Sequence, residues 1–276
     1  MIPRADIIQW RSLGHPWQSD AMVEQDLILS AMLVMLFEDA QVRDGLLFRG
    51  GTALHKLQLP EPLRYSEDID LVQREPGPIG PQFDRIREIL QNRFGEPRRK
   101  IGLGVATLTY RLDSEDAPPL PLRIKIEINT REHDQILPVE QKAFSVGSRW
   151  FEGGAEIPIY RVDELLATKL RALYQRRKGR DLFDLGLALR TLPIDAARMC
   201  GVFQQYMSAE GHDVTAADLR ANLERKLQHP GFLGDCAPLV RPGVTVDPVE
   251  DAELLDRQVI AVLEAGEARQ TEEEAR

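Results

Sequence analysis

Cysteine and aromatic residues are scarce in this chain of 276 residues. The two cysteines, Cys200 and Cys236, are too few for a disulfide framework and match no zinc-ligand spacing, so we expect both to be reduced and structural. Aromatic residues make up 6% of the chain, which is thin for a surface that stacks bases. These shortages exclude a disulfide scaffold and a cysteine-ligated zinc site.

Long apolar segments are also missing. The longest, Leu27 to Phe37, is interrupted only by Ser30. It is much shorter than the roughly 20 residues that cross a bilayer, and acids flank it, so it predicts a buried helix. The first residues lack the basic start and apolar stretch of a signal peptide. We therefore expect no membrane partner and a cytoplasmic location.

Several common catalytic motifs are absent. The five histidines show no metal-ligand spacing, and the chain has neither a Gly-x-Ser-x-Gly elbow nor a Walker-type Gly-Lys-Ser/Thr loop. The net charge of −9 argues against indiscriminate binding of nucleic acid, but it is compatible with a local basic groove.

The hydrophobic pattern divides the chain near residues 155–162. The first part mixes sheet and helix signals, and the second part is helical. We predict an α+β fold, with a mixed sheet and flanking helices in residues 1–160 and a helical domain in residues 161–276. The acidic tail from about residue 267 is expected to fray.

Individual elements follow from periodicity and from breaker residues. The expected strands are 46–48, 69–72, 105–112, 122–129, 139–146 and 157–160. The expected helices are 17–42, 52–57, 83–94, 163–177, 181–190, 195–208, 215–227 and 248–268. The strand 122–129 alternates cleanly, because Leu122, Ile124, Ile126 and Ile128 share one face and polar residues share the other.

Two glycines lie between an expected strand and an expected helix. At Gly50 and Gly51 the backbone can approach an anion closely, and the start of a helix favours negative charge. Thr52 could act as an N-cap, as a donor to phosphate, or as both. A lone Gly-Gly pair is more often an ordinary turn.

Two aspartates lie on the next expected strand. Asp68 and Asp70 project to the same face, where their mutual repulsion would be relieved by bound Mg²⁺. Glu127, on the polar face of another strand, is the natural third carboxylate. Such acids can hold Mg²⁺ against the phosphates of a nucleotide. Each acid alone would be unremarkable on a solvated surface, but the order Gly-Gly, helix, Asp-x-Asp is more specific.

A lysine falls within an apolar stripe in the helical half. Lys169 lies amid Leu165, Leu166, Leu170 and Leu173, so its ammonium needs a buried anion or a cleft, unless the side chain extends outward to water. The segment from residue 169 to residue 180 holds six cations and no acid, which could attract a triphosphate or an RNA backbone, or could be a solvated helix end.

Two aspartates follow this run. Asp181 and Asp184 are three residues apart in an apolar segment, so we expect them to pair with Lys169, with Arg180 or with a ligand. Alternatively, Asp181 caps the helix and Asp184 forms a structural ion pair. The spacing does not decide which of the two would be catalytic.

Together these segments resemble a known family. The stretches 48–56 and 64–71 resemble the opening motifs of the AbiEii/AbiGii abortive-infection nucleotidyltransferase toxins, and residues 167–170 and 178–185 are similar to a later block of that family. The resemblance implies a polymerase-β-like nucleotidyltransferase domain followed by helices. It also implies an antitoxin partner, often a winged-helix regulator. Some members add nucleotides to the 3′ end of tRNA and so block translation.

The resemblance also implies roles for single residues. Nucleotide binding falls to Gly50, Gly51, Thr52, Lys56, Ser66 and Arg180. Catalysis falls to Asp68, Asp70, Lys169, Asp181 and Asp184. Mg²⁺ or Mn²⁺ would be held by Asp68, Asp70 and, less securely, Glu127. The spacer between Thr52 and Asp68 is longer than in many nucleotidyltransferases but normal for these toxins.

The predicted reaction is transfer of a nucleoside monophosphate from a nucleoside triphosphate to tRNA. Two alternatives share the same motifs. One is a small-molecule nucleotidyltransferase of the antibiotic-modifying kind, and the other is an inactive nucleotide-binding or interaction module. The preferred base, the acceptor and the oligomeric state are not encoded in any recognisable signature.

Overall fold

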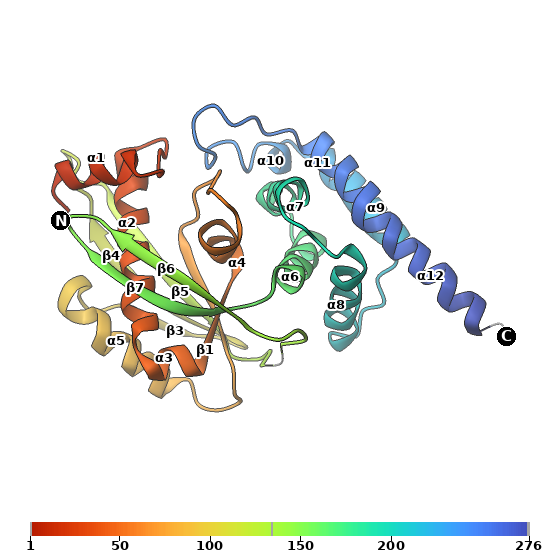
Figure 1. Ribbon diagram of the computed structural model, residues 1–276, viewed down its shortest axis with the longest axis horizontal. Helices are drawn as coiled ribbons and strands as arrows, with labels where there is room; N and C mark the ends of the chain where they lie inside the picture. The colour runs from red at the N-terminus through yellow and green to blue at the C-terminus, as the bar shows by residue number, and fades with distance from the viewer. Residues whose placement is uncertain (1, 134, 275–276) are drawn as a thin grey trace. The chain divides into compact units, whose positions relative to one another are not determined.

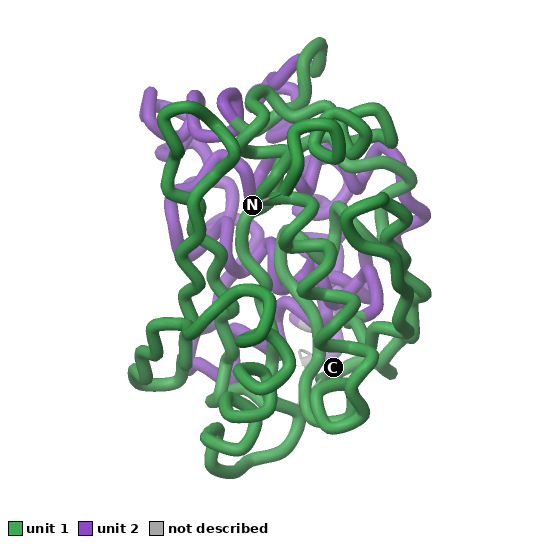
Figure 2. The backbone as a smooth tube through the Cα atoms, turned by 90° about the vertical axis from the view of Figure 1, so that its left-hand side faces the viewer, with its two compact units in different colours: residues 1–160, 239–244 green, residues 161–238, 245–276 purple. Residues whose placement is uncertain are grey.

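The computed structural model of the protein describes residues 2–133 and 135–274. The chain forms two compact units (Figure 2). The first holds residues 1–160 and takes in residues 239–244, and the second holds residues 161–238 and 245–276. Within the described ranges, no helix is both long enough and apolar enough to cross a membrane.

The first unit is built on a seven-stranded mixed sheet (Figure 1). Its strands are β1 (Leu46–Arg49), β2 (Asp68–Gln73), β3 (Arg98–Ile101), β4 (Val105–Asp113), β5 (Pro121–Asn129), β6 (Glu140–Gly147) and β7 (Glu152–Ile159). They lie in the order β3-β4-β5-β2-β1-β7-β6. The pairs β1–β7 and β2–β5 are parallel, and the other pairs are antiparallel.

The helices of the first unit are α1 (Arg4–Ser12), α2 (Asp20–Glu38), α3 (Ala40–Gly45), α4 (Gly50–Ala53), its π-helical continuation η1 (Leu54–Gln58), and α5 (Gly80–Phe94). The predicted helix 17–42 is in fact two helices, because Asp39 is extended and caps α3 by accepting a hydrogen bond from the Val42 amide. The apolar run Leu27 to Phe37 is confirmed as a buried helix, which contributes much of the core.

One face of the sheet packs against this core. Ile124, Ile126 and Ile128 of β5 are fully buried, as are Leu108 and Tyr110 of β4. The residues between them point to the opposite face, as strand alternation requires. The predicted polar and apolar faces of residues 122–129 are therefore confirmed.

The second unit is helical. Its elements are α6 (Val162–Gln175), α7 (Gly179–Thr191), α8 (Ala196–Ala209), α9 (Ala216–Leu227), α10 (Pro230–Leu233), α11 (Pro248–Leu255), η2 (Asp256–Ile260) and α12 (Ala261–Glu274). Helix α6 packs against both α7 and α8 through its leucine stripe. Helix α12 extends to Glu274, through the segment expected to fray, and residues 275–276 lie outside the described residues. The mixed sheet and the helices after it confirm the predicted α+β class.

Candidate active site

A glycine turn joins β1 to α4. Gly50 has a φ of +82°, which only glycine adopts readily. A Cβ atom at this position would lie 2.1 Å from Oδ2 of Asp70. The turn therefore needs glycine for two reasons, and it brings the backbone directly against one of the predicted catalytic carboxylates.

A buried arginine lies beside the second glycine. The side chain of Arg64 donates a hydrogen bond of 2.9 Å to the Tyr65 carbonyl, and the residue is only 3% exposed. A Cβ on Gly51 would lie 2.5 Å from Nη2 of Arg64. Sequence reasoning did not assign Arg64 to the site. Its position in the stretch 64–71 is a signal, but nothing in the sequence shows that its guanidinium contacts the turn.

Thr52 has a different environment from the one predicted. The N-cap of α4 is Arg49, so the prediction that Thr52 caps the helix is wrong. The buried Thr52 hydroxyl donates a 2.5 Å hydrogen bond to the carbonyl oxygen of Asp68 and lies 2.8 Å from Oγ of Ser66. These contacts tie the turn to the start of β2, so Thr52 and Ser66 fix where Asp68 lies.

Lys56 is held away from solvent. Its Nζ atom lies 2.8 Å from Oδ1 of Asp26 and 2.9 Å from Oγ of Ser30, both on α2. Burial alone would raise the pKa of Asp26, but Lys56 and His15 hold it well below its ordinary value. This geometry gives Lys56 a structural ion pair, and it offers no support for the predicted role in nucleotide binding.

The two aspartates of β2 lie on one face of the sheet, as predicted. Asp68 is opposite Lys125 of β5, and Asp70 is opposite Glu127 of the same strand. On its other side, Asp70 is opposite Arg49 of β1. Residues directly opposite each other share a face, so the register brings Asp68, Asp70 and Glu127 to one polar surface.

Lys125 lies among these acids. Its Nζ atom is 3.4 Å from Oδ2 of Asp68 and 3.4 Å from Oε1 of Glu127. Burial would lower the pKa of Lys125, but the two carboxylates raise it above its ordinary value. Lys125 is one of the polar residues on the outer face of the predicted strand 122–129, but the sequence analysis did not assign it to the site. The signal was available, because it shares that face with Glu127.

The acidic surface carries more negative charge than Lys125 balances. Burial raises the pKa of Asp68 to about 6, although Lys125 opposes the rise. The neighbouring acids Asp70, Glu67 and Glu127 add to it. A carboxyl group with a raised pKa would be stabilised in its charged form by an additional cation.

The donor set fits a magnesium ion. Carboxylate oxygens are the ligands that Mg²⁺ prefers, and such sites take one or two carboxylates and are completed by water and by the substrate's phosphates. Among the residues that the structure describes, no cluster of three or more His, Cys, Asp or Glu side chains forms a metal cage of its own. Asp68 and Asp70 therefore fit a site of the shared kind.

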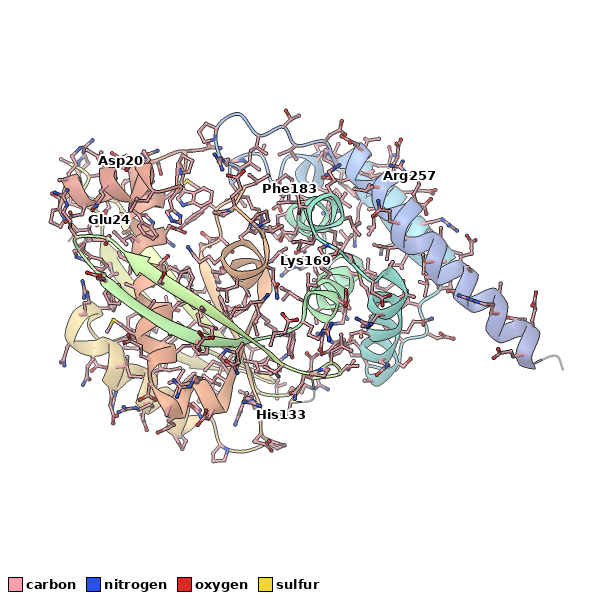
Figure 3. All side chains as sticks on the ribbon, in the orientation of Figure 1. Asp20, Glu24, His133, Lys169, Phe183 and Arg257 are labelled. Carbon is pink, nitrogen blue, oxygen red and sulfur yellow. The ribbon has the colours of Figure 1, made fainter. Side chains whose placement is uncertain are left out.

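The second unit contains the predicted lysine, on α6 (Figure 3). Lys169 is 6% exposed, and its Nζ atom lies 2.8 Å from Oδ2 of Asp184 and 3.4 Å from Oδ1 of Asp181. Both aspartates lie on α7 and are fully buried. Arg176 also binds Asp181 through two hydrogen bonds, of 2.7 and 2.9 Å. The predicted pairing of Lys169 with these acids is thus what the structure shows.

The basic run around Lys169 is largely neutralised by acids from elsewhere in the second unit. Lys178 and Arg180 both lie within 4 Å of Asp235, and Arg171 lies 3.3 Å from Glu210. With Lys169 and Arg176 also paired, five of the six cations have a carboxylate partner. Arg180, predicted to bind nucleotide, donates from both its backbone amide and its Nε atom to Asp235.

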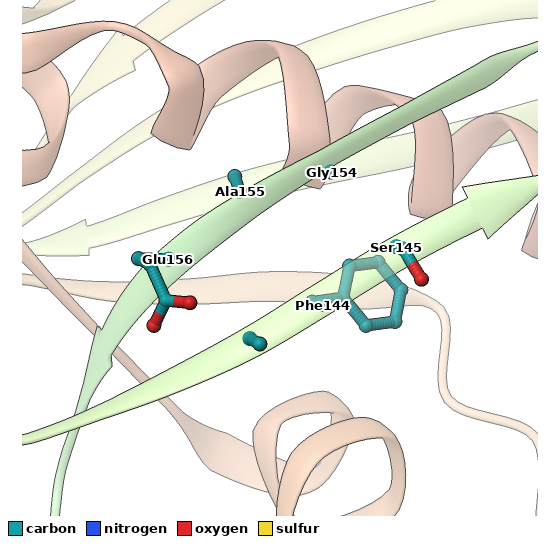
Figure 4. A pocket seen from close by; sticks show the side chains of 6 residues that line it. Phe144, Ser145, Gly154, Ala155 and Glu156 are labelled. Atoms are coloured by element: carbon teal, nitrogen blue, oxygen red, sulfur yellow. The ribbon is translucent and has the colours of Figure 1, made fainter.

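Other hollows of the first unit lack this chemistry. A hollow of about 330 Å³ lies on the hairpin β6–β7 (Figure 4), where small side chains and Glu156 surround Phe144. Another, of about 320 Å³, lies beside Trp150 and Arg93. Neither contains a pair of neighbouring carboxylates beside a glycine turn. The surface around Asp68 and Asp70 is therefore the candidate active site of the first unit.

Comparison with known proteins bears on the family and on the fold. The family described as "Nucleotidyl transferase AbiEii toxin, Type IV TA system" matches residues 32–253. No curated protein sequence matches the chain.

Solved structures show the same fold. MenT4, the nucleotidyltransferase toxin Rv2826c from Mycobacterium tuberculosis H37Rv, is 18% identical, with a TM-score of 0.63 over 98% of this chain and 93% of its own. A putative nucleotidyltransferase from H. pylori is 17% identical, with a TM-score of 0.55 over 91% of this chain and 98% of its own. JHP933 from Helicobacter pylori is 15% identical, with a TM-score of 0.52 over 93% of this chain and 97% of its own.

Proposed function

Because the chain belongs to the family of AbiEii nucleotidyltransferase toxins, we propose that it transfers a nucleoside monophosphate from a nucleoside triphosphate to the 3′ end of tRNA, in a reaction that requires Mg²⁺. The family establishes a nucleotidyltransferase of a toxin–antitoxin system, with a nucleoside triphosphate as substrate and an antitoxin as partner. The metal, the tRNA acceptor, a cytoplasmic location and a winged-helix antitoxin are the proposed refinements.

One observation carries the proposal. The carboxylate of Asp70 fills the space that a side chain on Gly50 would need, so a carboxylate of β2 and the glycine turn meet at one point. Backbone amides at such a turn can bind phosphate oxygens. In the proposed complex, Gly50 and Gly51 bind the outer phosphates, and Arg64 adds positive charge beside Gly51.

The acids would hold the metal. Asp68 and Asp70 are the proposed ligands of Mg²⁺ or Mn²⁺, and Glu127 could add a third carboxylate. When bound, the ion supplies Lewis-acid neutralisation of the triphosphate. Thr52 and Ser66 keep Asp68 in place through the hydrogen bonds at the start of β2. Lys125 limits the repulsion between Asp68 and Glu127 before substrate binds.

In the proposed reaction, the acceptor hydroxyl gives its proton to solvent, its oxygen bonds to the α-phosphorus, and the bond to pyrophosphate breaks. We also propose a catalytic role for Lys169, as the resemblance to the family implies. The burial of Asp181 and Asp184 against its ammonium supports a positioning role for both, since an acid already paired in this way is a poor general base.

Label transfer tests the proposal. Purified protein is incubated with Mg²⁺, total tRNA and each α-labelled triphosphate in turn, and the RNA is resolved on a denaturing gel. We expect label on tRNA with one or more triphosphates, and no label after periodate oxidation of the 3′ terminus. Asp70→Asn should reduce transfer about a thousandfold, because several kcal/mol of charge stabilisation are lost.

Arg99→Gln, a change on the opposite sheet face, is the matched control and should transfer normally. Failure to label RNA with any of the four triphosphates, by folded protein, would refute the proposal. Label in a small-molecule product would instead favour the antibiotic-modifying alternative. Toxicity that survives Asp68→Ala would favour the inactive binding module.

A further inference from the structure

The face that carries the catalytic acids extends beyond them, across three further strands. Asp68 of β2 is opposite Lys125 of β5, which is opposite Thr109 of β4, which is opposite Arg98 of β3. The next row along the strands consists of Asp70, Glu127, Thr107 and Lys100. Both rows begin at an acid and end at a cation on the sheet edge.

A third row contains cations only. Arg111 of β4 lies directly opposite Arg123 of β5. Like charges in directly opposite positions destabilise a sheet. We call the four residues Arg98, Lys100, Arg111 and Arg123 the basic face, and all four are exposed.

These cations have no acidic partners. Among the described residues, no carboxylate oxygen lies within 4 Å of a charged nitrogen of the basic face. An acid, Glu96, lines a shallow hollow of about 200 Å³ together with Arg98, Thr109 and Arg111. By contrast, Arg99 points to the other face and is paired with Asp84 at 2.7 Å. Of the three cations on β3, the two without a carboxylate within 4 Å among the described residues, Arg98 and Lys100, therefore lie on the face of the catalytic acids.

On a protein of net charge −9, this local group of unpaired cations is a surface that attracts anions. Neighbouring strands lie about 4.8 Å apart, and same-face residues along a strand about 6.8 Å apart, so the cations are spread over about 10 Å across the strands and about 14 Å along them. The face is open and lacks aromatic residues. It therefore suits several phosphates of a chain better than one small ligand.

We propose that the basic face binds the phosphodiester backbone of the RNA acceptor and directs its 3′ end toward Asp68 and Asp70. This inference rests on the proposed transfer to RNA. Contacts of this kind position a polynucleotide without reading its sequence. They would let an acidic protein select RNA by one local surface.

The test measures RNA affinity and its salt dependence. The variant Arg98→Gln/Lys100→Gln/Arg111→Gln/Arg123→Gln and the unsubstituted protein are titrated against fluorescently labelled total tRNA between 50 and 200 mM salt. Removing four phosphate contacts should lower the slope of log affinity against log salt by about 3 and weaken binding about a hundredfold in 0.1 M salt. In the transfer assay, the KM for tRNA should rise correspondingly.

Two controls exclude an effect on folding. Arg99→Gln removes a cation from the same strand but the other face, and should leave the affinity for tRNA unchanged. Replacing the three arginines of the basic face by lysine, with Lys100 unchanged, keeps the charge and should preserve most of the binding and the slope.

The outcomes separate this inference from the proposed function. If the unsubstituted protein labels tRNA and the quadruple glutamine variant binds tRNA with unchanged affinity and slope, the inference is overturned while the function stands. If no RNA is labelled or bound by the unsubstituted protein, both fail. If the glutamine variant keeps its affinity for tRNA but escapes its antitoxin in cells, the face binds a protein instead, which also overturns the inference.

Discussion

Two basic regions of this protein differ in how their charges are balanced. The run from Lys169 to Arg180 in the second unit is dense in sequence, but five of its six cations are paired with acids. The basic face of the first unit is dispersed over three strands, and its cations have no such partners in the described chain. Charge density along a sequence is therefore a poor guide to charge available for binding.

The physical reason is burial. Lys169 and its two aspartates are almost completely removed from water, where an ion must be paired to be tolerated. The basic face stays in water, where an unpaired arginine costs little and remains free for a ligand. The first region should therefore determine stability, and the second should determine binding.

The largest effect expected from this contrast is that of replacing Lys169. Lys169→Met leaves Asp184 without its lysine contact and Asp181 with Arg176, so we expect a loss of about 3–5 kcal/mol in the free energy of unfolding. Far-UV circular dichroism during urea unfolding measures it, because the second unit is helical. Arg177→Gln removes the exposed cation of the same run that has no carboxylate of a described residue within 4 Å. It is the control and should change stability by less than about 0.5 kcal/mol.

The loss of stability in Lys169→Met should depend on pH, and the direction of this dependence follows from the pKa of Asp181. Burial alone would raise the pKa of Asp181, but Lys169 and Arg176 hold it below its ordinary value. An acid with a depressed folded pKa stabilises the protein above its unfolded pKa and loses that contribution as the pH falls. The cost of Lys169→Met should therefore shrink in acid. A cost that grows below pH 4 would contradict this account.

These regions also show what the sequence could reveal. The strand 122–129 was predictable because its apolar residues alternate and its core face is buried. Strand β3 was missed because all four of its residues are exposed and its sequence Arg-Arg-Lys-Ile has no such alternation. Without β3, the basic face could not be assembled from the sequence.

The candidate site was predictable to a similar degree. The Gly50–Gly51 turn and Asp68 and Asp70 are local features, so their order along the chain indicated them. The partner of Lys56 is not local: Asp26 lies thirty residues earlier, on another helix. Likewise, Asp235 and Glu210 neutralise the basic run from distant segments, and residues 239–244 return to the first unit.

The second prediction concerns the acidic surface around Asp68, where the carboxylates outnumber the cations that could neutralise them. Burial raises the pKa of Asp68 from its ordinary 3.8 to about 6, so its ionisation destabilises the fold increasingly as the pH rises from 3.8 to about 6, and fully above that. Asp68→Asn removes this penalty, and we expect a gain of about 2 kcal/mol at pH 7.5. The gain should disappear below pH 4, where both forms are neutral.

Tryptophan fluorescence in EDTA measures this gain, because Trp10, Trp17 and Trp150 all lie in the first unit. The same variant should lose nucleotide transfer, so stability and activity move in opposite directions. Equal stability of the two proteins at pH 7.5 would show that Lys125 alone balances the acidic surface.

A smaller effect distinguishes the partners of Asp181. Arg176 is half exposed, yet its two hydrogen bonds reach a fully buried carboxylate. We expect Arg176→Gln to cost about 1–2 kcal/mol, because charge-assisted bonds are lost while Lys169 still contacts Asp181. Circular dichroism with Arg177→Gln as reference measures the difference. If Arg176→Gln lost as much stability as Lys169→Met, the burial of a cation would not determine how much it contributes to stability.

The smallest expected effect is on the basic face itself. Arg111→Gln/Arg123→Gln removes a repulsive cross-strand pair, so the first unit should unfold with unchanged free energy or with a gain of up to about 0.5 kcal/mol. Because the repulsion acts across solvent, any gain should fade between 50 mM and 1 M salt.

Arg99→Gln, which breaks an exposed ion pair with Asp84, should instead lose up to about 0.5 kcal/mol. Tryptophan fluorescence resolves both changes within the same unit. If the double variant lost 2 kcal/mol or more, the two arginines would contribute to stability as Lys169 does, and the contrast between the two basic regions would not hold.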